Sequence, residues 1–94
     1  MPFLKIPPEI SAALGGYLRG QREVVVNALT VLRDRLENNY DTYKSDRNKE
    51  DNRYFNYRLR ILDLDYNWHT FLFVIDDSLA SGYLLISGLS HKLG

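Results

Sequence analysis

The chain of 94 residues contains no cysteine, carries no net charge and has no long hydrophobic run. The lack of cysteine excludes disulfide bonds and thiolate metal sites, and it fits a reducing compartment. No apolar run approaches the ~20 residues that cross a bilayer, and the N-terminal stretch MPFLKIPPEI lacks the charged and apolar regions of a signal peptide. We therefore expect a cytoplasmic protein with no membrane segment.

The charge balance limits the classes of partner. Twelve Lys and Arg residues offset twelve Asp and Glu residues, so no overall positive field attracts nucleic acid. Proteins that follow a nucleic-acid backbone draw much of their affinity from neutralising phosphates. A role of that kind must therefore depend on a local cluster of basic side chains.

Motifs for several other kinds of chemistry are absent from the sequence. There is no Gly-rich phosphate loop, no Ser nucleophile elbow and no CxxC pair. The two histidines, His69 and His91, lie far apart in sequence, and Asp76 with Asp77 is typical of a turn. We expect neither a metal ion nor a cofactor.

The first half of the chain predicts one strand and two helices. Residues 3–6 predict a short strand, and the two prolines that follow suit the first turn of a helix. Residues 10–18 have helical spacing, and Gly20 suits the end of that helix. Residues 21–39 predict a longer amphipathic helix, and the polar stretch 40–53 predicts a solvated loop. The apolar face of the longer helix consists of Val25, Ala28, Leu29, Leu32 and Leu36.

The second half predicts three strands. Apolar and polar residues alternate over 55–61, the period of a half-buried strand. Residues 63–67 supply turn chemistry, and the nearly continuous apolar run 68–75 predicts a central strand covered on both faces. A further connection begins at Asp76, and residues 82–86 predict the last strand.

Together these elements predict an α+β fold with the order β-α-α-β-β-β. A short N-terminal strand precedes an αα-hairpin and a three-stranded antiparallel meander, with the helices packed against one face of the sheet. We expect a single domain over residues 1–94.

The order and spacing of these elements resemble the RelE/ParE superfamily of bacterial toxins. The segment LGGYLRGQREVVVNALTVLRDRLENN at 14–39 is similar to the helical hairpin of that family, and YRLRI at 57–61 to the strand that carries its basic residues. The stretch HTFLFVIDDSL at 69–79 looks like its central strand and turn, and LLISGLSHK at 84–92 like its closing strand. His69 stands where many members have an arginine.

The resemblance implies a toxin of a toxin–antitoxin system, held in check by a small cognate antitoxin. Members of the superfamily either cleave mRNA in the ribosome or poison DNA gyrase. The function that we expect is that of a ribosome-associated mRNA endoribonuclease acting by metal-independent general acid–base cleavage. The alternative is a non-catalytic protein-binding domain of the same fold, directed at gyrase or serving as an immunity or adaptor protein. A third reading is a sequence-tolerant RNA binder that uses the aromatic residues of its strands.

Cleavage of RNA without a metal requires a base near the ribose 2′-OH, cations beside the phosphorane and an acid at the leaving oxygen. Arg58 and Arg60 are two residues apart on one strand, so they project from the same face and suit the binding of a phosphate. His69 and His91 are the candidates for proton transfer. We expect these four catalytic candidates to converge on the sheet face opposite the helices.

Three further residues complete the candidate RNA-binding surface. Lys92 would add local positive charge, and Tyr57 and Arg53 would contact the RNA. Arginines that alternate with apolar residues most often belong to an ordinary solvated face, and core packing and cross-strand pairs explain strand aromatics more simply than base stacking does.

Overall fold

The computed structural model describes residues 2–43, 53–78 and 82–94. Over these residues it confirms the α+β layout, with a short strand, two main helices and then a meander of three strands. The elements are β1 (Phe3–Lys5), α1 (Pro8–Tyr17), α2 (Arg22–Asn38), α3 (Tyr40–Tyr43), β2 (Tyr54–Leu62), β3 (Trp68–Asp76) and β4 (Tyr83–Leu93).

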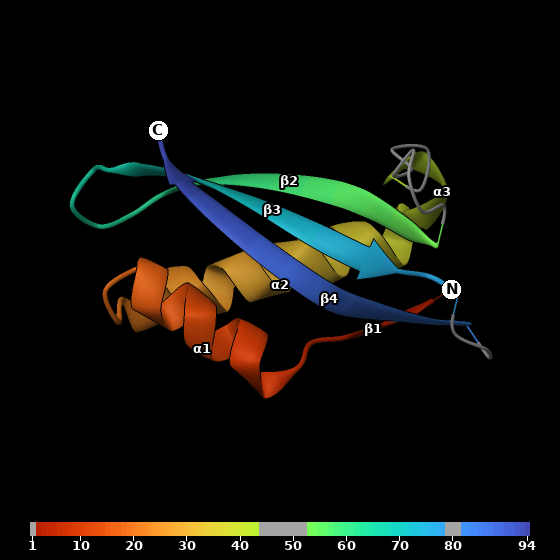
Figure 1. Ribbon diagram of the computed structural model, residues 1–94. Helices are drawn as coiled ribbons and strands as arrows, with labels where there is room; N and C mark the ends of the chain where they lie inside the picture. Colours follow the sequence, from red (N-terminus) through yellow and green to blue (C-terminus); the bar gives the residue numbers. More distant parts are fainter. Residues whose placement is uncertain (1, 44–52, 79–81) are drawn as a thin grey trace.

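The strands form one sheet in the order β1-β4-β3-β2 (Figure 1). β2, β3 and β4 are antiparallel neighbours, as predicted, whereas β1 lies parallel to β4. The two main helices carry the chain from β1 at one edge of the sheet to β2 at the opposite edge. In the described part of the chain no helix is both long and apolar enough to span a membrane.

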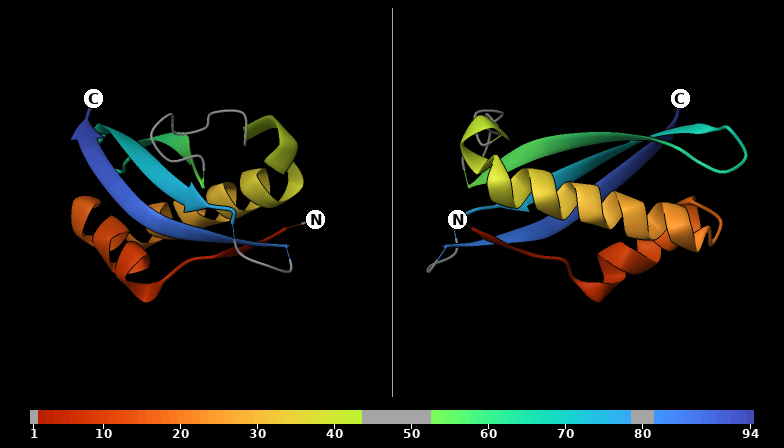
Figure 2. Two further views of the ribbon diagram at one scale, coloured as in Figure 1. Left: turned by 45° about the vertical axis from the view of Figure 1, so that its right-hand side comes forward. Right: turned by 180° about the vertical axis from the view of Figure 1, so that it is seen from behind.

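α1 and α2 cover one face of the sheet, as the two views in Figure 2 show. α2 turns one apolar residue in every fourth position toward the sheet, which is the spacing of a helix face. Each large apolar side chain buried there stabilises the fold by about 1.5–3 kcal/mol. The fully buried side chains include Leu14, Leu32, Leu36, Phe55, Phe71, Phe73 and Ile75. We call the other side of the sheet, away from α1 and α2, the open face.

Three details differ from the sequence prediction. The stretch predicted as a loop begins with the short helix α3, and its residues 44–52 lie outside the described residues. β4 continues to Leu93, well beyond the predicted end at residue 86. The prediction that both faces of β3 are covered is wrong, because none of the helices in the described residues packs on the open face, and Thr70, Leu72 and Val74 are only half-buried there.

Side chains of α2 occupy the outer edge of β1. The backbone N–H of Leu4 donates to Glu37 Oε2 at 2.7 Å, and Arg33 donates to the Leu4 carbonyl at 2.8 Å. Arg33 also donates to Glu37 Oε2 at 2.9 Å. The pair therefore takes the place of a neighbouring strand at Leu4, where an edge would otherwise offer free backbone groups.

Candidate functional site

The alternation in β2 places its two arginines on the open face. Phe55, Tyr57 and Leu59 are buried against the helices, whereas Arg58 and Arg60 are exposed. Successive strand residues point to opposite sides of a sheet, so both guanidinium groups project away from the helices. This part of the expected arrangement agrees with the sequence prediction.

A β-bulge in β4 brings a third cation to the same side. Ile75 pairs with Ile86, but Val74 pairs with Gly88, so Ser87 is an extra residue without a partner in β3. Beyond the bulge the sides of β4 are exchanged, as one extra residue requires. Lys92 therefore points to the open face, and it pairs with Thr70.

Arg58, Arg60 and Lys92 form what we call the basic cluster. Arg60, Thr70 and Lys92 occupy one row across three strands, and Arg58 begins the next row. Between them is a hollow of about 580 Å³ on the open face. Among the described residues that line this hollow there is no Asp or Glu side chain; they are Arg58, Arg60, Thr70, Leu72, Ser90, His91, Lys92 and Gly94.

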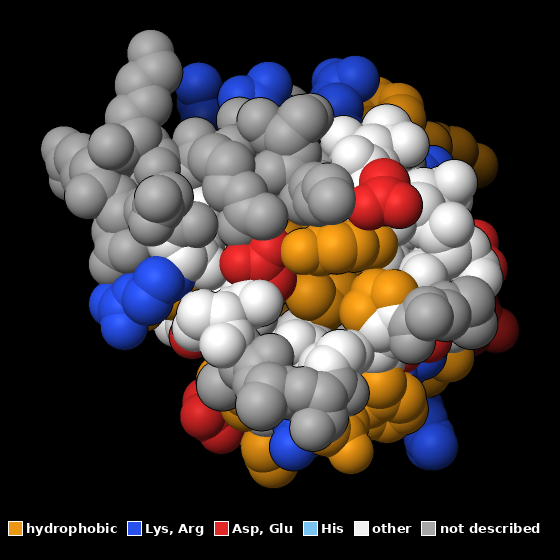
Figure 3. Space-filling model, turned by 90° about the vertical axis from the view of Figure 1, so that its right-hand side faces the viewer, with side chains coloured by type: hydrophobic (Ala, Val, Ile, Leu, Met, Phe, Trp, Pro, Cys, Tyr) orange, Lys and Arg blue, Asp and Glu red, His pale blue; other side chains and the backbone are white. Residues whose placement is uncertain are grey.

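The spacing of the cluster makes its charges act together. Arg58 and Arg60 are about 7 Å apart along the strand, and two strand spacings separate Arg60 from Lys92 by about 10 Å. These distances match the Debye length of ~10 Å in 0.1 M salt, so the three potentials add at a bound anion. In Figure 3, which views the sheet from the end near the N-terminus, Lys and Arg side chains stand along the upper edge, on the side away from the helices.

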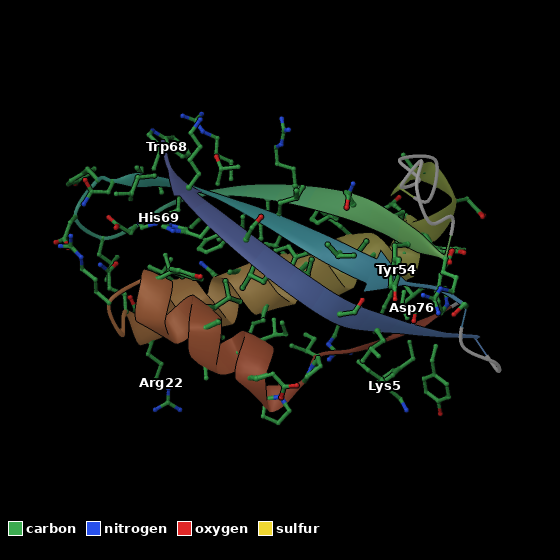
Figure 4. The ribbon with its side chains drawn as sticks, viewed as in Figure 1. Lys5, Arg22, Tyr54, Trp68, His69 and Asp76 are labelled. Atoms are coloured by element: carbon green, nitrogen blue, oxygen red, sulfur yellow. The ribbon has the colours of Figure 1, made fainter. Side chains whose placement is uncertain are left out.

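The two histidines lie on the other side of the sheet, so the expectation that they join the arginines is wrong. His69 is 3% exposed and packs beside Phe71, with which it stacks at 6.0 Å. His91 pairs with Phe71 across the strands, so its ring faces the same way, even though the residue also lines the hollow. Figure 4 shows the contrast on β3, where Trp68 lies above the sheet and His69 lies between the sheet and the helices.

A chain of hydrogen bonds joins Asp63, His69 and His91. His69 Nε2 lies 2.7 Å from Asp63 Oδ2, and His69 Nδ1 lies 2.8 Å from His91 Nε2. When Asp63 is ionised it accepts the Nε2–H of His69, which leaves Nδ1 of a neutral His69 bare. His91 must then donate its Nε2–H to that nitrogen. We call these three residues the buried relay.

Asp63 is held at one end of the relay by the turn between β2 and β3. Its Oδ1 accepts the backbone N–H groups of Asp65 and Asn67 at 2.8 and 2.9 Å. The hydrogen bond from His69, followed by that from Asn67, keeps the pKa of Asp63 below its usual value, because each favours the charged carboxylate. The turn thus fixes an ionised carboxylate that is only 5% exposed.

His91 ends the relay against α1. Its ring stacks on that of Tyr17 with 4.4 Å between centroids and an angle of 18°. Burial lowers the pKa of His91, and the electrostatic effect of His69 lowers it further, because both disfavour the charged imidazolium. The relay therefore links the turn, two strands and α1, and its geometry is that of a structural network.

Two other candidates are also away from the basic cluster. Tyr57 is 4% exposed, and its hydroxyl accepts a hydrogen bond from Arg35 at 2.9 Å, so its burial contradicts the expected contact with RNA. Arg53 precedes β2 and lies over the ring of Tyr54 at 5.0 Å. It is five residues from Arg58, the nearest member of the cluster, which is roughly 17 Å along an extended strand.

The described residues offer no evident place for a metal ion. Within residues 2–43, 53–78 and 82–94, no group of three or more His, Asp or Glu side chains is arranged to hold one. In the buried relay the donor atoms instead bind one another through protons. Comparisons of the chain with protein-family models, curated proteins and solved structures give no match. What the site can do must therefore follow from its own residues.

Proposed function

We propose that this chain is a toxin-like RNA-binding domain of the RelE/ParE type, which binds the phosphate backbone of mRNA at the ribosome through its open face. The observation that carries the proposal is the basic cluster, in which Arg58 and Arg60 of β2 and Lys92 of β4 occupy one row and its neighbour on the open face. A chain with no net charge needs a local concentration of cations to bind RNA. Arg58, Arg60 and Lys92 meet that need.

The chemistry of the cluster favours binding over cleavage. Guanidinium groups donate paired hydrogen bonds to phosphate and remain charged at any physiological pH. Proton transfer needs a group within hydrogen-bonding reach of the reacting atoms, and both imidazoles belong to the relay on the other side of the sheet. We therefore propose that the domain acts by occupying RNA, without cleavage by histidine.

Its cellular setting is part of the same proposal. The resemblance to RelE/ParE toxins suggests a cognate antitoxin, and a surface that must be silenced would be the one that the antitoxin covers. We propose that the antitoxin lies over the basic cluster, and that the complex acts in the cytoplasm, where ribosomes are found.

The test compares two double variants with the same change in net charge. Arg58→Gln/Arg60→Gln removes charge from the open face, and Arg19→Gln/Arg22→Gln removes it from the helical side, where Figure 4 shows Arg22 pointing away from the sheet. Anisotropy titrations would use a short fluorescent single-stranded RNA and ribosomes programmed with mRNA. Since each charge-assisted hydrogen bond contributes about 1–1.5 kcal/mol, the loss of two should weaken binding of the first variant about 30- to 150-fold, and the second should bind like the wild type.

Growth and RNA integrity give the second readout. Expression of the wild-type chain in a bacterium should arrest growth, and Arg58→Gln/Arg60→Gln should relieve the arrest. His91→Gln should leave RNA binding unchanged. Cleaved mRNA that disappears in His91→Gln would contradict the non-catalytic proposal. Binding that is equally weak, or equally strong, in both double variants would instead favour the alternative of a protein-directed domain.

A further inference from the structure

Trp68 stands exposed beside the basic cluster. It is the first residue of β3 and is 43% exposed, although it is the largest side chain in the sequence. The guanidinium carbon of Arg60 lies 4.2 Å from the centroid of its ring. The ring does not belong to the hydrophobic core, which lies on the other side of the sheet.

The backbone around Trp68 is fixed on both sides. It pairs with Leu62 of β2, and its carbonyl accepts the N–H of Gly94 at 2.8 Å. The carbonyl oxygen of Gly94 in turn accepts a hydrogen bond from the hydroxyl of Thr70 at 2.7 Å. An indole held in this way presents a flat surface at a low cost in conformational entropy.

The ring also has the right position relative to the cations. Trp68 and Thr70 are neighbours on the open face, and Thr70 lies between Arg60 and Lys92 in their row. A phosphate held by that row lies roughly 7 Å from Trp68, the distance of two residues along a strand, so the base of the adjoining nucleotide can reach the indole. Aromatic rings beside a basic groove bind single strands because any unpaired base can stack on them.

We propose that Trp68, supported by Arg60, is a stacking platform for an unpaired base, and that it makes the open face selective for single-stranded RNA. This inference rests on the proposed function, since the cluster must first hold the backbone. In a duplex the bases are stacked on one another and only phosphates and groove edges are available. A duplex would therefore gain nothing from the indole.

Fluorescence tests the platform directly, because Trp68 is the only tryptophan in the chain. Titration with short single-stranded RNA should quench its emission. An abasic strand of the same length and a duplex of the same sequence should bind through phosphates with much less quenching. Equal quenching by all three ligands, or none by the single strand, would overturn the inference.

Substitutions provide the second arm. Trp68→Ala should weaken single-stranded binding about 5- to 150-fold, as expected for one stacked base, and should leave binding of the abasic strand unchanged. Trp68→Phe should restore most of the affinity. Tyr83→Ala is the matched control, since Tyr83 is 38% exposed and carries Lys5 Nζ 4.2 Å from its ring centroid, yet lies at the other end of β4.

The two proposals fail in different ways. If Arg58→Gln/Arg60→Gln weakens every ligand while Trp68→Ala changes none, the platform is wrong and the proposed function stands. If neither variant changes RNA binding, the proposed function is wrong as well. Thermal unfolding of each variant confirms that it is folded. If Trp68→Ala does not fold, the affinity of Trp68→Phe and the quenching of Trp68 in the wild-type protein decide whether the platform exists.

Discussion

Replacing Arg58 and Arg60 should change the salt dependence of RNA binding by an amount that the structure fixes. For single strands, the slope of log K against log salt is about −0.7 per neutralised phosphate. The three cations of the cluster therefore give an expected slope of about −2.1 for the wild type. Between 50 and 200 mM salt, the affinity should fall about 18-fold.

The variant Arg58→Gln/Arg60→Gln keeps only Lys92 in the cluster. Its slope should be about −0.7, and its affinity should fall only about 2.6-fold over the same salt range. Lys92→Gln alone should give a slope of about −1.4. Anisotropy titrations at four salt concentrations, with one fluorescent single-stranded RNA, measure all three slopes.

The control variant decides whether the effect is local. Arg19→Gln/Arg22→Gln lowers the net charge by the same two units but leaves the open face intact, so its slope should equal that of the wild type. If this control flattens the slope as much as Arg58→Gln/Arg60→Gln does, the overall charge governs binding and the cluster has no special role. A wild-type slope near zero would refute phosphate binding altogether.

The relay and the β1 edge give three further predictions. Because the pKa of His91 is lowered in the folded state, the unfolded chain binds protons first and the free energy of unfolding should fall as the pH drops below about 6.5; the lowered pKa of Asp63 adds a further loss below about 3.8. Urea unfolding across this pH range measures both losses of stability, and His91→Gln should remove the loss that begins near pH 6.5. His69→Phe keeps a ring but leaves its partners unpaired, so urea unfolding should show a loss of about 1–3 kcal/mol, whereas exposed Ser90→Ala should stay within about 0.5 kcal/mol. Glu37→Ala leaves a backbone N–H of β1 unpaired and should cost about 1–3 kcal/mol in the same assay; no loss would show that water replaces the carboxylate.

The position of the helices and the side of the sheet on which the β2 arginines lie could be predicted, because a single hydrophobic periodicity determines each of them. The apolar residues of α2 recur at helical steps over seventeen residues, and only one face of such a helix can pack on a sheet. In β2, polar Arg58 and Arg60 alternate with large apolar residues, so the side on which each lies follows from the pattern.

The side of His69 could not be predicted because β3 is apolar on both sides. Phe71, Phe73 and Ile75 share its side, while Leu72 and Val74 occupy the other. Only the packing of the helices decides between the two sets. Asp63 has the same difficulty, since a carboxylate at the start of a turn is expected there for its backbone hydrogen bonds alone.

The sides of His91 and Lys92 depend on one residue. Plain alternation from Leu84 would turn Lys92 toward the helices and His91 to the open face. The bulge at Ser87 exchanges them. A signal was present in the glycine that follows, since glycine within a strand often marks a bulge; a β-carbon at Gly88 would lie 3.4 Å from atoms of Val74.

The extra residue at Ser87 also determines how β4 tolerates changes in length. A deletion of one residue between Ser87 and Ser90 can be absorbed when the strand straightens, and Lys92 then keeps its place beside Thr70. An insertion of one residue in the same stretch finds no such slack. In a strand without a second bulge it would carry the ammonium group inward and bring an imidazole out beside the guanidinium groups, so that the length of this segment decides which chemistry the surface has.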